Sequence, residues 1–283
     1  MPINNVLTID VEDYFQVAAL SDAISVNEWE NIPTRVERNT NKILDLFDEH
    51  NVKGTFFTLG WVADRYPSLV KEIDRRGHEV ASHGYSHQLI YSQSKDVFRD
   101  ETFKSKNILE DITGKAVDGY RAASYSITKE SLWAIDILVE AGFKYDSSIF
   151  PVRHDRYGIV NSPKEPYVIK GPEGGEIVEY PLTTYSMLGQ DLPVAGGGYF
   201  RLYPYWLTNY FYRSLNSKGK SFAFYLHPWE VDPEQPKVEV SWFSKFRHYN
   251  NLHKCSKRLS KLLSNYQFLP MRKELERLGF LAE

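Results

Sequence analysis

Apolar positions in the first half of the chain follow two alternating spacings, one typical of short buried strands and one typical of helices. The apolar runs predict five strands, over Val6–Asp10, Gly54–Leu59, Glu79–Ser82, Val117–Arg121 and Lys144–Ser147. The amphipathic segments between them predict four helices, over Arg35–His50, Pro67–Arg76, Asp96–Ile112 and Lys129–Ala141. Regular alternation of strand and helix is the pattern of βαβ units, so the sequence predicts an α/β fold around a parallel sheet or barrel.

The pattern loosens between Pro151 and Tyr199, where prolines and glycines interrupt any long helix. We expect loops and short strands here, as an insertion at about residues 151–201. Regular structure is predicted again further on, as helices near Tyr205–Ser217, Phe243–Leu263 and Met271–Leu278 and a strand over Ser221–Leu226. We therefore expect residues 1–283 to form a single domain that carries this insertion and a helical C-terminal segment at about residues 240–283.

The balance of charged residues bears on whether the chain binds nucleic acid or another anionic partner. The chain has 34 basic and 37 acidic residues and a formal net charge of -3, so no overall positive charge indicates a nucleic-acid partner. Between Val240 and Lys273, however, there are eight lysines and arginines and no acidic residue. This basic C-terminal segment is either a solvated helix face or a surface for an anionic polymer or for the membrane.

The single cysteine, Cys255, excludes an internal disulfide and a cysteine-based metal cluster, so any metal must be bound by His, Asp or Glu. No apolar run approaches the roughly 20 residues of a membrane span. The first residues lead directly into the strand Val6–Asp10 without the charged and apolar regions of a signal peptide. We therefore expect a cytoplasmic protein, at the inner face of the membrane if the basic segment binds there.

Residues that can support chemistry stand at the ends of the predicted strands. His83 and His87 follow one strand and are four residues apart, so on one face of a short helical turn they could bind one metal ion. Asp10, Glu12 and Asp13 follow another. Arg121, Asp146 and His227 end three more. The carboxyl ends of parallel strands meet at one edge of a sheet or barrel, where active sites assemble.

In this order the elements resemble the polysaccharide deacetylase family, carbohydrate esterase family four, whose fold is a distorted (β/α) barrel with an incomplete set of strands. The amino-acid sequences of five segments most resemble the subgroup of this family that is associated with exopolysaccharide loci and the exosortase system. These segments are Asp10-Val11-Glu12-Asp13-Tyr14-Phe15, Gly119-Tyr120-Arg121, Tyr145-Asp146-Ser147-Ser148-Ile149-Phe150-Pro151, Gly196-Gly197-Gly198-Tyr199-Phe200-Arg201-Leu202 and His227-Pro228-Trp229-Glu230.

The resemblance implies a divalent metal, usually zinc, bound by His83 and His87, and a substrate that is an N-acetylated polysaccharide or oligosaccharide. It further implies that Asp10 is the general base and that Arg121 positions it. His227 would be the general acid that protonates the departing amine, and Asp146 would tune or orient the catalytic groups. In such a reaction the metal polarises the acetyl carbonyl and lowers the pKa of a bound water molecule.

The chain departs from the family pattern at the third metal ligand. The family usually has two adjacent aspartates at the first strand, and here the second position is Val11. Glu12 lies two residues after Asp10 and points to the same face if the strand continues, whereas Asp13 needs a turn to return there. We favour Glu12 and keep Asp13 as the alternative.

Two other functions are compatible with such a sequence. Related barrels hydrolyse cyclic imides or allantoin-type amides, and a carbohydrate-binding protein could keep the fold without turnover. A polymer-acting enzyme should have an open groove lined with aromatic residues around Pro151–Arg201, whereas a small-molecule enzyme should have a closed pocket. A non-catalytic binder has no need of Asp10, Arg121 and His227 together.

Overall fold

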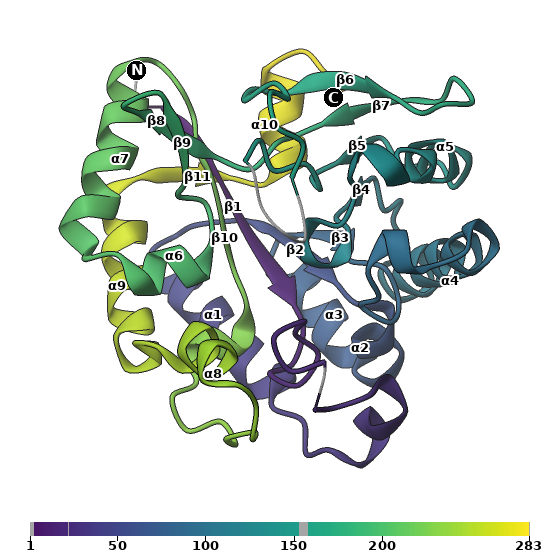
Figure 1. Cartoon of the computed structure of the whole chain (residues 1–283), viewed down its shortest axis with the longest axis horizontal. Coiled ribbons are helices and arrows are strands. Elements are labelled where there is room, and N and C mark those ends of the chain that lie inside the picture. The colour runs from purple at the N-terminus through teal and green to yellow at the C-terminus, as the bar shows by residue number, and fades with distance from the viewer. Residues whose placement is uncertain (1–2, 22, 153–157, 283) are drawn as a thin grey trace.

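The computed structural model describes residues 3–21, 23–152 and 158–282 (Figure 1). The strands are β1 (Asn4–Val11), β2 (Thr55–Thr58), β3 (Glu79–Ser82), β4 (Gly119–Tyr120), β5 (Tyr145–Asp146), β6 (Tyr167–Lys170), β7 (Glu176–Glu179), β8 (Thr184–Met187), β9 (Gln190–Pro193), β10 (Ala223–Leu226) and β11 (Gln267–Leu269). The α-helices are α1 (Val36–Glu49), α2 (Gly60–Arg65), α3 (Pro67–Arg75), α4 (Lys95–Thr113), α5 (Trp133–Glu140), α6 (Gly197–Leu202), α7 (Tyr205–Ser217), α8 (Trp242–Tyr249), α9 (Leu252–Asn265) and α10 (Met271–Arg277).

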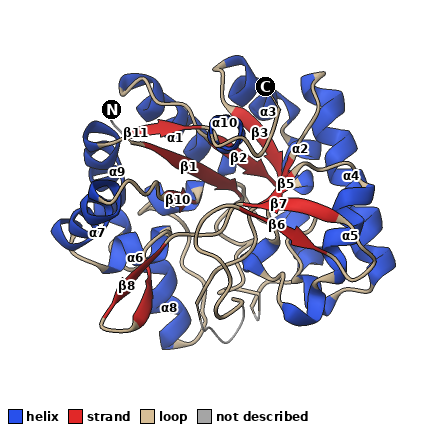
Figure 2. Cartoon of the chain, turned by 90° about the horizontal axis from the view of Figure 1, so that it is seen from above, coloured by secondary structure: helices blue, strands red, loops and turns tan. Residues whose placement is uncertain are grey.

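Nine strands form one sheet in the order β10-β1-β2-β3-β4-β5-β7-β6, with β11 pairing with the start of β1. Every pairing is parallel except that of β6 with β7. Within the described residues β10 and β6 do not pair with each other, so the ring of strands is not closed. The predicted α/β class is therefore confirmed, in the form of a distorted and incomplete barrel with helices around it (Figure 2).

Helix α1 buries one face, as its sequence predicts. In α1 the buried positions Val36, Thr40, Ile43, Leu44 and Phe47 recur every three or four residues, which is the helical period. The predicted helix over Phe243–Leu263 is instead two helices, because Asn251 adopts a left-handed φ of 54° between α8 and α9. The short helix α2 and the strand β11 lie outside the elements expected from the sequence.

The inner face of the barrel carries both apolar and polar side chains. One buried cluster contains Val6, Phe57, Ala81 and Tyr145 of the strands together with Met271 and Leu275 of α10. Side chains on a strand alternate between faces, so Thr8 and Asp10 share the face of Val6 further along β1. Asp10 lies opposite Phe57 in the register, so the polar residues at the carboxyl end of β1 adjoin this apolar cluster.

The region expected as an insertion supplies part of the main sheet. Strand β7 pairs in parallel with β5, so Glu179 lies beside Asp146 in the sheet. Strands β8 and β9 form a separate hairpin, and α6 follows them. Residues 153–157 of this region lie outside the described residues.

The basic C-terminal segment is partly occupied by internal contacts. Arg258 donates to the carbonyls of Phe200, Arg201 and Tyr203, at the end of α6. Arg272 forms ion pairs with Asp118 and Glu276. The exposed lysines of α9, on which a surface interaction of this segment would depend, are Lys254, Lys257 and Lys261. Among the described helices none is both long enough and apolar enough to cross a bilayer.

Candidate active site

The carboxyl ends of five strands bring the polar residues singled out from the sequence to one level of the barrel. In the register of the sheet, Asp10 of β1 lies opposite Phe57, Ser82 opposite Tyr120, and Tyr120 opposite Asp146. On the other side of β1, Ile9 lies opposite Leu226. The residues that follow these positions, His83, Arg121 and His227, therefore lie around the end of β1.

Glu12, His83 and His87 form a group that could bind a metal ion. One ligand atom from each lies within 4.8 Å of the other two. The Nδ1 of His83 lies 2.8 Å from the carbonyl oxygen of Arg121. Because a carbonyl only accepts, Nδ1 carries the proton and Nε2 keeps a lone pair for a ligand bond. Burial lowers the pKa of His83 to about 4, which keeps the ring neutral as metal binding requires.

The carboxylate of Glu12 is buried and incompletely satisfied. Its Oε2 lies 2.8 Å from Nε2 of His87, yet it is not aligned for a hydrogen bond with any group in the described part of the chain. Burial alone would raise the pKa of Glu12, but the nearby His87, His227 and His83 lower it to about 2. An ionised carboxylate with an unsatisfied oxygen between two imidazoles suits a cation.

The two histidines converge through a different backbone path from the one expected. Residues 83–87 form no helical turn. Instead the chain turns at Gly84, with a φ of 73°, and at His87 itself, with a φ of 53°. The ring centroids of His83 and His87 lie 5.3 Å apart as a result. A left-handed conformation at a histidine is uncommon and strained, and such strain is frequent at functional sites.

Asp13 serves a different purpose from Glu12. Its Oδ2 accepts hydrogen bonds from the backbone nitrogens of Arg35 and Val36, at 2.5 and 2.9 Å. These nitrogens begin α1 and have no partner within the helix. Burial raises the pKa of Asp13 to about 6 although these hydrogen bonds oppose the rise. The structure thus uses Asp13 to cap α1 and does not bring it into the group of Glu12 and the histidines.

Asp10 and Arg121 form a buried ion pair beside this group. Asp10 Oδ1 accepts from Arg121 Nη1 at 2.6 Å, and its Oδ2 accepts from the hydroxyl of Tyr125 at 3.2 Å. The guanidinium is held in turn by Thr8 Oγ1 and by the hydroxyl and carbonyl of Ser147. Both charged side chains are almost completely buried. This arrangement fixes the direction of the Asp10 carboxylate, as the proposed role of Arg121 requires.

His227 lies next to both Glu12 and Asp10. Its Nε2 lies 3.4 Å from Glu12 Oε1 and 3.9 Å from Asp10 Oδ2. Burial would lower the pKa of His227, but the charges of Glu12, Glu230 and Asp10 together raise it to about 9. The imidazole therefore holds a proton near neutral pH, with Nε2 directed at the two carboxylates.

The contact that orients His227 comes from Glu230 and not from Asp146. Glu230 Oε1 accepts from His227 Nδ1 at 2.8 Å, and its Oε2 accepts from Arg201 Nε at 2.5 Å. Arg201 also donates to the carbonyls of His248 and Asn250, near the end of α8. A Cβ at Gly197 would overlap the Glu230 carboxylate, so only glycine allows α6 to pass here.

Asp146 lies deeper and acts on the neighbouring loop. Its Oδ1 accepts from the hydroxyl of Ser148 at 2.5 Å, and Ser148 Oγ accepts from the backbone nitrogen of Ala122. Burial raises the pKa of Asp146 to about 6, and burial together with the charge of Asp146 raises the pKa of Glu179 well above its usual range. The two carboxyls therefore share a proton at neutral pH. Asp146 contacts neither Asp10 nor His227, so any tuning of the catalytic groups is indirect, through the loop that carries Arg121.

A cavity of about 160 Å³ opens onto these side chains. It is lined by Asp10, Glu12, His83, His87 and His227 and by Val17, Ala18, Ser124, Tyr125, Tyr225 and Trp229. Ser124 and Tyr125 have φ angles of 50° and 56°, so a second strained segment lies in its wall. A base candidate, an acid candidate and a metal-binding group therefore share one small, partly enclosed space.

Known proteins resemble this chain in sequence and in fold. Residues 26–145 match the family model described as polysaccharide deacetylase, and residues 147–276 match a domain of unknown function, DUF3473. A peptidoglycan-N-acetylglucosamine deacetylase of Bacillus cereus is 38% identical over 98 residues, which are 34% of this chain and 36% of that protein. The match covers only 36% of the length of this relative, and likewise 36% of a peptidoglycan deacetylase of Helicobacter pylori.

Two solved structures share the fold over almost the whole chain. A protein from Mycobacterium smegmatis assigned as a polysaccharide deacetylase has a TM-score of 0.61 and 19% identity, and the likeness covers 99% of this chain and 94% of that one. An allantoinase has a TM-score of 0.59 and 16% identity, with 99% and 91% covered. At these identities the likeness shows the fold alone, which both proteins share.

Histidines and carboxylates gather at the carboxyl ends of the strands of this incomplete (β/α) barrel. Together they form a candidate hydrolytic metal centre. Residues 26–145 resemble the polysaccharide deacetylase family, and the rest of the described site lies outside that match. The site uses both matched segments, because His83, His87 and Arg121 lie in the first whereas His227, Glu230 and Arg201 lie in the second. Asp10 and Glu12 precede both.

Proposed function

We propose that this chain is a metal-dependent hydrolase that removes N-acetyl groups from sugars of a polysaccharide or of its oligosaccharide precursor, a reaction at a carbon–nitrogen bond other than a peptide bond. The proposal rests on the placement of Asp10 and His227 beside the group formed by Glu12, His83 and His87, within one cavity. Hydrolysis of an amide needs a base for water and an acid for the departing nitrogen.

The residues present fit a divalent ion, and we propose zinc. Two imidazoles and one carboxylate are a known ligand set of catalytic zinc. Within the described residues Glu12 Oε2 accepts no aligned hydrogen bond, and it lies 2.8 Å from Nε2 of His87. The carbonyl of Arg121 fixes the tautomer of His83 that such a site needs. A bound ion would supply Lewis acidity at the acetyl carbonyl and a lower pKa for water.

The side chains of the chain itself supply the proton transfers. Asp10 accepts the proton of the attacking water, and its contact with Arg121 holds the carboxylate in place at the cavity. His227 then donates the proton on Nε2 to the nitrogen of the sugar as the carbon–nitrogen bond breaks, while Glu230 stabilises its charged form through Nδ1. Acetate and the free amine leave.

The choice of an acetylated sugar over an allantoin-type amide rests on sequence. The fold comparison gives almost equal TM-scores for the two classes, 0.61 and 0.59, so it does not separate them. The match of residues 26–145 and the likeness to a peptidoglycan-N-acetylglucosamine deacetylase favour a sugar. We propose an exopolysaccharide as the polymer, because the five sequence segments described above resemble the exopolysaccharide-associated subgroup. We further propose that the protein acts in the cytoplasm and contacts the membrane peripherally through Lys254, Lys257 and Lys261.

The substrate class can be tested directly with the purified chain and one equivalent of zinc. Acetate release is measured from N-acetylglucosamine oligomers and from peptidoglycan fragments, and ring opening is measured with allantoin and a cyclic imide. We expect acetate from the oligomers and no ring opening. Ring opening without acetate would establish the amidohydrolase, and neither product from metal-loaded protein would indicate a carbohydrate-binding protein without turnover.

The third metal ligand gives a sharper test, because the two alternatives are neighbours in sequence. We expect Glu12→Ala to lose most of its bound metal and to unfold near the temperature of the parent's metal-free form. We expect Asp13→Ala to keep its metal and to be destabilised by about 0.5–2 kcal/mol, since it loses a helix cap. Metal content and thermal unfolding of both variants decide the point, and the reverse pattern would make Asp13 the ligand.

A further inference from the structure

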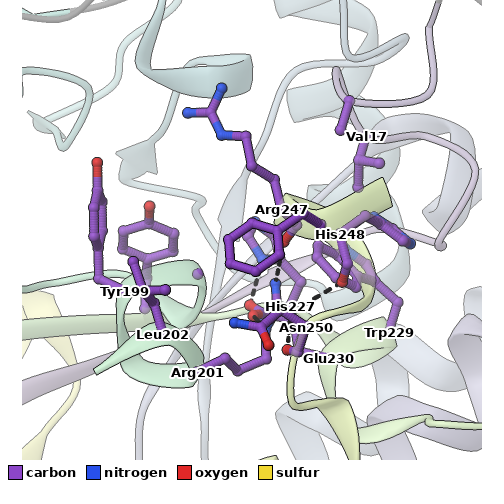
Figure 3. A pocket seen from close by; sticks show the side chains of 14 residues that line it. Val17, Tyr199, Arg201, Leu202, His227, Trp229, Glu230, Arg247, His248 and Asn250 are labelled. Carbon is purple, nitrogen blue, oxygen red and sulfur yellow. Dashed lines mark hydrogen bonds and ion pairs between the residues drawn. The ribbon is translucent and has the colours of Figure 1, made fainter. Parts of the chain in front are cut away.

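A second and larger cavity adjoins the one that holds the metal-binding group. Its volume is about 230 Å³, which is room for a ligand fragment and not only for ordered water. Val17, Tyr225, His227 and Trp229 line both cavities. The rest of the lining comes from α6, from α8 and Asn250 after it, and from Ala19 and Glu230. Figure 3 shows Tyr199 and Leu202 on one side of it and Trp229 and His248 on the other.

A stack of rings forms the partition between the two cavities. The Trp229 ring lies between His227 and His248, with centroid distances of 5.2 and 4.3 Å and interplanar angles of 18° and 16°. The indole Nε1 also donates to Glu12 Oε1 at 3.2 Å. A ligand that filled both cavities would therefore pass along the edge of the Trp229 ring, which stacks on His227, the proposed general acid.

The wall of the second cavity combines apolar surfaces with a few polar groups. Tyr199 and Leu202 come from α6, and Phe246 from α8 is 42% exposed, although it is a large apolar side chain. Asn250 and Arg247 bring polar atoms to the same wall. Binding sites for small organic groups typically have this mixture. A pyranose ring presents C–H faces to aromatic rings and hydroxyls to amides and guanidinium groups, so it matches such a wall.

Gly198 is the feature that neither packing nor backbone conformation explains. It lies in α6, its φ is not in the left-handed region, and a Cβ built on it meets no atom within 4 Å. Glycine inside a helix is less favourable than alanine by roughly 1 kcal/mol. Its neighbour Gly197 is required by the approach of Glu230, whereas Gly198 leaves open space in the wall of the cavity.

We propose that this second cavity binds the sugar unit next to the one that is deacetylated, so that the enzyme recognises at least two linked pyranose rings. The inference rests on the proposed function and specifies its substrate as an oligomer. The acetylated unit occupies the cavity of Asp10 and the metal-binding group, and its neighbour lies against Tyr199 and Phe246. The two cavities share a wall, and a small cyclic amide would leave the second one unused.

The second cavity and the metal-binding histidines lie in two different matched segments of the chain. Tyr199, Gly198, Phe246 and Asn250 all lie in residues 147–276, which match the domain of unknown function. Residues 26–145, which match the polysaccharide deacetylase model, contain His83 and His87 and none of the side chains peculiar to the second cavity. The second segment would thus add recognition of a neighbouring sugar to a deacetylase centre.

Substitution at Gly198 tests the proposal without touching the metal-binding or proton-transferring residues. The variants are Gly198→Ala, which adds one methyl group, and Gly198→Phe, which fills the cavity. The control is Trp206→Ala, because Trp206 is a 70% exposed aromatic residue of α7 that does not line the cavity. All are compared by thermal unfolding, and by acetate release from N-acetylglucosamine monomer, dimer and tetramer.

We expect the parent and Trp206→Ala to prefer the tetramer and dimer over the monomer. Gly198→Phe should lower kcat/KM for the dimer and tetramer by about 10-fold or more, chiefly through KM, and leave the monomer unchanged. Gly198→Ala should lie between. A loss that is equal for monomer and tetramer, or no loss at all, would overturn the proposal.

Calorimetric binding of the same oligomers separates this inference from the proposed activity. If the parent releases no acetate but binds the tetramer, and Gly198→Phe weakens that binding by about 10-fold, the second cavity is a sugar site although the proposed reaction is wrong. Tetramer binding that Gly198→Phe leaves unchanged, or no binding by the parent at millimolar tetramer, would exclude it.

Discussion

Asp10→Asn is expected to lower acetate release by about 10²- to 10⁴-fold, the usual contribution of a general base. The amide has the shape of the carboxylate, and its one oxygen can still accept from Arg121. Its NH2 group cannot accept from Tyr125, and the amide cannot take a proton from water. Asp10 is not in the group of Glu12, His83 and His87, so the bound metal should remain. The measurements are kcat and metal content in the same preparation.

The substitution also leaves the buried Arg121 without its ionised partner, so its effect on folding must be measured separately. Thermal unfolding of the metal-loaded variant serves as the control. Loss of metal in proportion to the loss of activity would assign Asp10 to the metal site instead of to proton transfer. Activity close to that of the parent would remove the base role altogether.

His227→Ala is expected to lower the turnover of N-acetylated sugars by about 10²- to 10⁴-fold and to leave the metal in place. The departing amine needs a proton, and Nε2 of His227 is the proposed donor. In an activated acetate ester such as 4-nitrophenyl acetate, the 4-nitrophenolate leaving group departs without protonation. Hydrolysis of this ester by His227→Ala should therefore fall much less than hydrolysis of the amide. The ratio of the two rates measures the acid role and is insensitive to a general loss of folded protein.

His83→Ala and His87→Ala are the comparison for this result. Both should lose metal and lose activity toward the amide and the ester alike. Equal metal loss in all three variants would overturn the separation of roles. An equal fall for ester and amide in His227→Ala would assign His227 a positioning role near Glu12.

The position of the site at the carboxyl ends of the strands could be predicted because the ends of buried strands can be recognised in the sequence. Buried runs that stop at a polar residue placed Asp10, His83, Arg121, Asp146 and His227 at the ends of strands, and the parallel register then brings those ends together. The period of two along a strand favoured Glu12 over Asp13, and only Glu12 is grouped with the histidines. Local periodicity was sufficient for these inferences.

Contacts between distant segments could not be predicted in this way. Arg201 reaches Glu230 from another helix, and Gly197 is needed only because of that approach. Asp13 caps a helix that begins 23 positions later. The spacing of Glu230 three residues after His227 was a visible signal, because a carboxylate there can return to the start of a short helical turn. The conformation of residues 83–87 depends on two left-handed residues, of which only Gly84 indicates a turn by its type.

We propose that a metal held by Glu12, His83 and His87 and a base at Asp10 together hydrolyse an N-acetyl group. The most direct test measures acetate released from N-acetylglucosamine tetramer by the parent chain and by Asp10→Asn, before chelation, after chelation and after zinc is returned. We expect the parent to release acetate, to stop when the metal is chelated and to recover when zinc is returned. Asp10→Asn should release almost none even with its metal bound. Release that continues in the metal-free parent, or that Asp10→Asn matches, would contradict the proposal.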